Sequence, residues 1–356
     1  MKAFVSKNHQ FFLRDKNFFL NQLFSTFRYW FEIKKNSDRR FILIVYGGII
    51  IFVLFCSTFK VHSQQSAIFS QSMFNQLTIN PAYAGSSEVV NLFGTSRQQW
   101  IGLDGHSKTT VFGFDAPINM FKSEAGLGLN FSNDQIGFSE EIVVNLSGSL
   151  KYRLQTGTIN VGLNFGIINH VLKPEWEVPT SDYHSADDNL LVDSEQSASV
   201  FDMGIGTFYT CEKWFGGLSL THLFNPAPKF DDSYFYYLKR TMYIFGGYSY
   251  SLQNRPIEFR PFAMIVTDGV SIQSDIHLQG VYKKRFWGGL GYRFGDAIIL
   301  DAGIELKNGL RLGYSYDVAT SGAISDNGGS HEVTIGYKFI LGIDKKSKGY
   351  KSVRYL

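Results

Sequence analysis

Residues 88–341 form successive segments in which apolar side chains alternate with glycine or small polar ones. Ala125 to Ser132, Thr158 to Ile167 and Leu310 to Asp317 are three such segments. A repeat of two predicts β-strands with one apolar face. The opposite face carries glycine, asparagine and serine more than lysine and glutamate. Because the apolar face is rich in Phe, Tyr and Leu along its whole length, the pattern predicts a wall between lipid and a polar lumen.

We predict an all-β fold, because about fourteen such segments can be placed along the chain and roughly 12–16 fit the pattern. Alternating segments separated by turn residues are typical of a transmembrane, antiparallel β-barrel of the outer membrane. The predicted strands begin near Glu88, Lys108, Glu124, Ile142, Thr158, Ser199, Lys213, Lys239, Ile257, Ser271, Arg285, Ala297, Gly309 and Ser330.

The links between the predicted strands differ in length in a regular way. The long links, residues 172–198, 224–238 and 318–329, all follow odd-numbered strands, and most links after even-numbered strands are tight. Consecutive links of an antiparallel barrel lie at opposite rims, so the long loops gather at one rim, as in outer-membrane barrels. A soluble β-sandwich gives no reason for this segregation. The link from Arg97 to His106 is expected at the same outer rim.

Basic residues are kept off the apolar face. A lysine or arginine at the lipid midplane costs about 2–4 kcal/mol, and a slip of one residue would expose Arg293 or Arg311 to hydrocarbon. Small lumen-facing residues leave space inside the barrel. Charged side chains are expected there, either as a network or as solvated wall residues; they are Arg260, Arg293, Arg311, Asp202, Asp301 and Glu305.

Composition divides the chain into four parts. In residues 1–63 a long basic region precedes the apolar run Phe41–Phe59, which predicts a signal peptide; an uncleaved membrane anchor is the alternative. Residues 64–87 are an N-terminal periplasmic segment, 88–343 the barrel and 344–356 a basic tail. The formal charge is +3, but residues 1–63 hold ten Lys/Arg against three Asp/Glu. The remainder is therefore mildly acidic, and nothing indicates nucleic-acid binding.

A turn-forming stretch, Asn80 to Gly85, precedes the first strand, because proline fixes φ and Gly85 permits the left-handed conformation. We expect the segment from Phe69 to Gly85 to fold into or across the periplasmic mouth as a plug. A mobile lead-in is the alternative. The buried contacts of a plug would be Phe69, Met73, Phe74, Leu77 and Ile79.

The long link after the seventh strand contains a cluster of aromatic side chains. Exposed, clustered tyrosine and phenylalanine favour recognition of another protein. Packing against a neighbouring loop, or a place in the interfacial aromatic girdle, is the alternative. The residues predicted to bind a partner are Tyr234, Phe235, Tyr236 and Tyr237.

Candidate chemistry is absent from the sequence. Gly126-Leu127-Gly128 and similar pairs are strand glycines rather than strand-to-helix turns, so no phosphate-binding loop is predicted. No Cys/His set has the spacing of a zinc site. We therefore expect no cofactor, no metal and no catalytic residue. A serine–histidine hydrolase inside the barrel is left as a third reading, without a spacing that singles one out.

An ordered series of motifs resembles the PorP/SprF family of type IX secretion membrane proteins, and it spans nearly the whole chain after the leader. The over-long leader and the basic tail from Asp344 to Leu356 depart from the family pattern. The motifs are Ile68 to Gly85, Arg97 to Gly105, Phe114 to Pro117, Gly126 to Leu129, Ser132 to Gly137, Tyr314 to Asp317 and Gly329 to Val333.

The resemblance implies a non-enzymatic outer-membrane barrel that works with the type IX secretion machinery. Its expected partners are a secreted type IX cargo protein, other components of that system, or both, together with outer-membrane lipid. Such proteins are associated with holding secreted proteins, including gliding adhesins, at the cell surface. A transport channel for hydrophobic or small solutes is the main alternative, because a barrel of this size can serve that purpose too.

Overall fold

The computed structural model describes residues 68–120, 123–173, 195–230, 234–235, 237–320 and 328–340. The chain divides into two compact units, Met1–Thr58 and Phe59–Leu356, and all described residues belong to the second. The predicted signal peptide and the predicted basic tail therefore lie outside the described residues. No helix among those residues is both long and apolar enough to cross a membrane.

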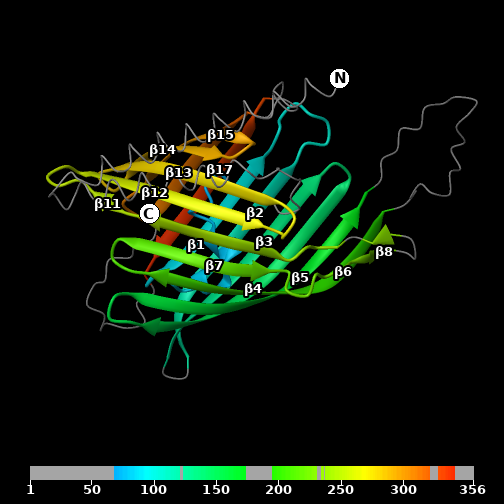
Figure 1. Cartoon of the computed structure of the whole chain (residues 1–356), viewed down its shortest axis with the longest axis horizontal. Helices are drawn as coiled ribbons and strands as arrows, with labels where there is room; N and C mark the ends of the chain where they lie inside the picture. The colour runs from blue at the N-terminus through cyan, green and yellow to red at the C-terminus, as the bar shows by residue number, and fades with distance from the viewer. Residues whose placement is uncertain are drawn as a thin grey trace, which may run out of the picture. The chain divides into compact units, whose positions relative to one another are not determined.

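Fourteen strands close into an antiparallel barrel (Figure 1). Each strand pairs with its neighbour in the chain, and β1 pairs with β17 to close the cylinder. The short β11 (Tyr250–Ser251) continues β10 (Thr241–Tyr248) along β12. The other barrel strands are β1 (Val90–Gln98), β2 (Lys108–Met120), β3 (Ser123–Ile136), β4 (Ser139–Arg153), β5 (Thr158–Leu172), β6 (Gln196–Thr210), β7 (Trp214–Thr221), β12 (Ile257–Thr267), β13 (Ile272–Tyr282), β14 (Phe286–Arg293), β15 (Ala297–Glu305), β16 (Leu310–Ala319) and β17 (Ser330–Phe339).

The predicted fold class is confirmed, and every predicted strand start lies within three residues of an observed one. One boundary was wrong. The sequence placed Arg97 in the link after the first strand, whereas β1 continues to Gln98 and pairs Arg97 with Glu332 of β17. This difference matters because Arg97 then faces the lumen, where its side chain is 2% exposed.

The two faces of the wall differ as the alternation predicted. Outward side chains are large and apolar, as at Leu290 (62% exposed) and Ile335 (49% exposed). Inward side chains on the same or neighbouring strands are polar and buried, as at Asp301, Ser315 and Glu332. Hydrocarbon outside and paired polar groups inside fix the register, because a slip of one residue would exchange the two sets.

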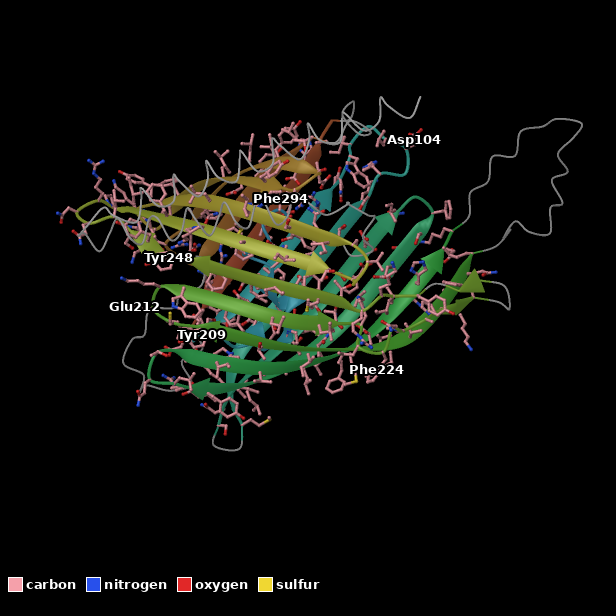
Figure 2. The ribbon with its side chains drawn as sticks, viewed as in Figure 1. Asp104, Tyr209, Glu212, Phe224, Tyr248 and Phe294 are labelled. Atoms are coloured by element: carbon pink, nitrogen blue, oxygen red, sulfur yellow. The ribbon has the colours of Figure 1, made fainter. Side chains whose placement is uncertain are left out.

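The links separate into two rims. One rim, which we call the long-link rim, holds link 99–107 and the described ends of links 173–195, 222–240 and 320–329. Links 154–157, 211–213, 252–256, 283–285 and 306–309 lie at the other, the short-turn rim. Figure 2 shows Tyr209, Glu212 and Tyr248 toward the short-turn rim, on the left, and Asp104 and Phe224 toward the long-link rim, on the right.

The segment that precedes the first strand lies inside the barrel and contacts its wall. This luminal segment, residues 68–87, contains α3 (Gln76–Ile79) and the 3₁₀ turn η1 (Pro81–Tyr83). Its side chains form one core with inward aromatic and aliphatic residues of the wall, including Phe208, Phe245 and Trp287. The hydrophobic core of this protein therefore lies inside the cylinder and depends on the luminal segment.

Placing a cation on the outer wall tests the assignment of faces. Leu290 lies near the middle of β14, and its cross-strand neighbours Leu278 and Leu300 are also outward and apolar. Leu290→Lys is expected to destabilise the barrel by about 2–4 kcal/mol, the cost of lysine at a bilayer midplane. The measurement is the urea midpoint of folding into lipid vesicles.

The matched control places the same side chain inside the lumen. Gln279 is inward, and its amide nitrogen lies 3.3 Å from a carboxylate oxygen of Asp301. Gln279→Lys is expected to cost clearly less than Leu290→Lys, because the ammonium gains a carboxylate partner. An equal or larger cost for Gln279→Lys would contradict the assignment of lipid-facing and luminal sides.

Candidate functional site

Two consecutive residues near the start of the luminal segment, Ser70 and Gln71, are held by buried charged side chains of the barrel wall. Glu332 of β17 accepts the backbone N–H groups of Ser70 and Gln71, at 2.8 and 2.9 Å. The Ser70 hydroxyl donates to Asp317 of β16 at 2.6 Å and accepts from Arg97 of β1 at 2.7 Å. Three strands near the barrel closure thus converge on two consecutive residues of the segment.

The carboxylates and guanidinium groups at this point also pair with one another. Arg97 lies 2.7 Å from Asp317 and 3.3 Å from Glu332. Arg293 lies 3.3 Å from Asp317 and 3.1 Å from Asp275. We call these five residues the luminal charge cluster. Each is nearly or fully buried, and buried ions are tolerated only when paired and hydrogen-bonded, so the cluster and Ser70 stabilise each other.

The far end of the luminal segment is fixed by backbone contacts to the opposite wall. The Asn80 amide donates to the carbonyl of Thr207 at 2.9 Å, and its side-chain oxygen accepts from the N–H of Ala82. The hydroxyl groups of Ser149 and Ser219 donate to carbonyls of the segment, at 2.7 and 2.5 Å. The segment is therefore tied to β4, β6 and β7 as well as to β1, β16 and β17.

Glycines on the inner wall make room for this contact. A side-chain carbon at Gly162 of β5 would overlap the backbone of Ala82, and one at Gly206 of β6 would overlap the Asn80 side chain. A carbon at Gly126 of β3 would overlap the Ala84 carbonyl. Glycine on the inner face of these strands thus lets another backbone approach closely.

The five predicted plug residues lie in the luminal segment, and four of the five belong to or pack against the core inside the barrel. Four of them are buried, and Ile79 is partly buried against the same core. The Phe74 ring lies 5.4 Å from that of Trp287, and the Arg311 guanidinium stacks over it at 4.7 Å. The buried four are Phe69, Met73, Phe74 and Leu77.

The luminal segment reaches deeper than the periplasmic mouth that the sequence suggested. The Gly85 N–H donates to Asp115 of β2, which is paired with Asn91 at the short-turn end of β1. Ser70 contacts Arg97 and Arg293, which stand at the long-link ends of β1 and β14. The segment thus traverses the lumen between the two rims. That it blocks conduction stays a prediction.

The charged lumen residues named from the sequence form several separate groups. Arg293 belongs to the luminal charge cluster, whereas Arg260 pairs with Glu258 at 2.8 Å. Glu305 lies between Lys338 and Arg311, at 3.3 and 3.8 Å. Asp202 lies 3.0 Å from His222, and Asp301 lies 3.9 Å from His277. The sequence did not single out Arg97, Asp317 and Asp275 as members of a buried charge cluster. Alternation along a strand shows that a side chain faces inward, but it does not show which side chains of other strands it meets.

The three predicted partner-binding residues that the structure describes lie at the long-link rim. Tyr234 and Phe235 form β9, which pairs with β8 (Lys229–Phe230) in a small hairpin beside β6. Tyr237 is 58% exposed, whereas Tyr236 lies outside the described residues. The Phe230 ring packs 5.6 Å from that of His170 on the inner face of β5. The hairpin is therefore attached to the rim at its base.

A second contact braces the same rim. Asp268, in the link after β12, accepts the backbone N–H groups of Val270 and Ser271 at 2.9 and 2.6 Å. It also lies 3.3 Å from Lys239 in the long link before β10. Burial alone would raise the pKa of Asp268, but these hydrogen bonds outweigh it and hold the pKa well below its usual value. The carboxylate is therefore charged at neutral pH and joins the two links.

No group of three or more metal-binding side chains occurs among the described residues. Ser139 and His170 come within hydrogen-bonding distance at 3.1 Å near the long-link rim. Glu141 lies 3.7 Å from the other nitrogen of that histidine, beyond a hydrogen bond.

Comparison with known proteins gives a family and several distant structural likenesses. Residues 61–337 match the family described as type IX secretion system membrane protein PorP/SprF. None of the curated proteins matches the chain. Among solved structures, the chain is similar to the Acinetobacter baumannii outer membrane protein Omp33, with 7% identity and a TM-score of 0.42. The alignment covers 72% of this chain and 100% of Omp33. It is also similar to the CymD monoaromatic hydrocarbon channel, with 11% identity, 79% and 95% covered, and a TM-score of 0.46.

The family match covers most of the chain, including the luminal segment and nearly all of the barrel. Outer-membrane barrels have short periplasmic turns and long extracellular loops, so we expect the long-link rim at the cell surface and the short-turn rim in the periplasm. The chain belongs to the PorP/SprF family of type IX secretion system membrane proteins and is a β-barrel of the bacterial outer membrane.

Proposed function

We propose that this barrel is a non-enzymatic component of the type IX secretion system that binds or anchors secreted proteins at the cell surface. Adhesins, including those used in gliding, are the cargo class that the family suggests. Other type IX components are proposed as further partners. Membership of the family supports association with the secretion system.

One observation favours anchoring over transport: the luminal segment crosses the barrel and is bonded to both sides of its wall. Its polar contacts reach β1, β16 and β17 on one side and β4, β6 and β7 on the other. Its side chains Met73, Phe74 and Leu77 are buried in the common core. A solute would have to displace these contacts in order to pass. The accessible surface for a large partner is therefore the long-link rim.

The aromatic hairpin is the part of that rim proposed to contact cargo. Tyrosine combines a large apolar surface with a hydroxyl group and is enriched where proteins bind one another. Tyr237 is exposed at the rim, next to β9. The hairpin is anchored through Phe230, so Tyr237 lies next to a supported element.

Conductance measures whether the luminal segment closes the barrel. The full chain in planar bilayers is expected to pass little current, and deletion of residues 65–78 is expected to raise it. Ser70→Asp should act in the same direction, because it places a third carboxylate beside Asp317 and Glu332. Ser70→Thr keeps the hydroxyl group and serves as the control. A deletion variant that folds but conducts no more than the full chain would refute the proposal that the luminal segment blocks the lumen.

Cargo display measures the anchoring role. A strain lacking this protein is expected to release or retain internally at least one type IX cargo that the parent strain displays. Tyr237→Ala is expected to weaken cargo capture roughly tenfold or more if the hairpin is a binding hot spot. Tyr250→Ala, an equally exposed tyrosine near the short-turn rim, is the matched control. Pull-down from detergent-solubilised outer membranes with mass spectrometry gives the readout, and normal display of every cargo would contradict the proposal.

A further inference from the structure

The short-turn rim carries a stretch of exposed basic side chains on one half of the barrel. The stretch covers the three turns between β11 and β12, β13 and β14, and β15 and β16. These turns are joined laterally, because the Lys283 N–H donates to the Pro256 carbonyl at 2.7 Å. The Glu305 N–H likewise donates to the Arg285 carbonyl at 2.7 Å. We call the stretch the basic rim; it consists of Arg255, Lys283, Lys284, Arg285 and Lys307.

The acids nearest to the basic rim are already paired with other cations. The three turns themselves contain no aspartate or glutamate. Glu258 lies close enough to Lys284 to interact with it but is bonded to Arg260 at 2.8 Å. Glu305 is bonded to Lys338 at 3.3 Å. The basic rim therefore keeps a net positive charge.

The other half of the same rim is balanced. Arg153 lies 2.7 Å from Glu124 and 3.8 Å from Glu88. Lys213 follows Glu212 directly in the turn between β6 and β7. Among the described residues, excess positive charge at the short-turn rim is thus concentrated on the half formed by β11 to β16.

An aromatic band lies directly beneath the basic rim on the lipid-facing wall. Tyr282 and Phe286 flank the turn between β13 and β14, and Tyr250 and Tyr337 occupy the same end of their strands. All four are outward and exposed. Aromatic bands of this kind sit at the depth of the lipid headgroups. The Lys283 ammonium lies 5.0 Å from the Tyr282 ring, which places this cation on the lipid side of the rim.

We propose that the basic rim is a binding site for anionic phospholipid headgroups of the periplasmic leaflet. Clustered lysine and arginine immediately beyond an aromatic band meet the plane of the lipid phosphates. The site would hold one side of the barrel against anionic lipid and leave the balanced half free of that attraction. This proposal does not depend on the cargo that the opposite rim binds.

The turn between β13 and β14 supplies a sharp test. Lys283 and Lys284 both have positive φ, 52° and 54°, a conformation in which asparagine and glycine are favoured. Lys283→Asn combined with Lys284→Gly removes two charges and supplies the residues that this turn prefers. The double variant is therefore expected to fold at least as stably as the parent, so a loss of lipid binding cannot be attributed to a damaged barrel.

The experiment titrates the full chain in non-ionic detergent at low salt with dioleoyl phosphatidylglycerol or dioleoyl phosphatidylcholine. Native mass spectrometry counts the bound lipids. The parent is expected to prefer phosphatidylglycerol, and the double variant to bind it roughly 30-fold more weakly, about fivefold for each basic residue near the headgroups. The control, Lys108→Gln with Lys213→Gln, removes two exposed cations elsewhere and should keep the preference.

Two results would overturn the proposal. One is a parent protein that binds both lipids equally, and the other is a double variant that retains the full preference for phosphatidylglycerol. A hexaglutamate peptide tests the alternative of an acidic protein partner. Binding of that peptide to the basic rim without any preference for phosphatidylglycerol would assign the site to a protein instead.

Discussion

Every backbone polar group in the hydrocarbon of a bilayer must find a partner within the protein, and this constraint shapes the whole molecule. A β-sheet satisfies it only when it closes, since an open edge would present unpaired N–H and C=O groups to lipid. Here the pairing of β1 with β17 removes the edge. Closure then forces the side chains into two sets, one facing lipid and one facing inward, and the alternation seen in the sequence follows directly.

The same closure creates an interior that the wall residues alone do not fill. The inner wall has no side chains at Gly126, Gly162 and Gly206, and the luminal segment packs against the backbone at these points. The segment supplies the missing aromatic and aliphatic side chains, and its backbone amides bind the buried carboxylate of Glu332. Without Ser70 and Gln71, Glu332 would keep Arg97 as its partner but lose two hydrogen bonds. The buried charges and the segment therefore stabilise each other, which ties the lumen to the chain's own N-terminal region.

The barrel could be predicted from the sequence because its signals are local. Alternation of period two sets each strand, and turns such as Asn308-Gly309 set the boundaries between them. The apolar residues named as buried contacts of a plug, such as Phe69, Met73 and Leu77, likewise lie close together in the chain. In both cases residues close together in the chain carry the information.

The luminal charge cluster could not be predicted in this way, because its members lie far apart in the chain. Arg97 and Glu332 meet only where the first strand pairs with the last, and Ser70 reaches them by crossing the lumen. Arg97 was also assigned to a link, since the polar run that follows it hides the end of β1. The alternation along a strand places a side chain on the inner face, but only the closed barrel shows which inner side chains face one another.

Amide hydrogen exchange shows most directly whether the luminal segment is a fixed part of the barrel. Mass spectrometry of the protein in lipid vesicles follows exchange at residues 68–85 and at the strand β5 for comparison. Because the N–H groups of Ser70 and Gln71 donate to a buried carboxylate, we expect protection of those two amides that approaches that of the strand. Exchange of the whole segment as fast as that of a free peptide would contradict it.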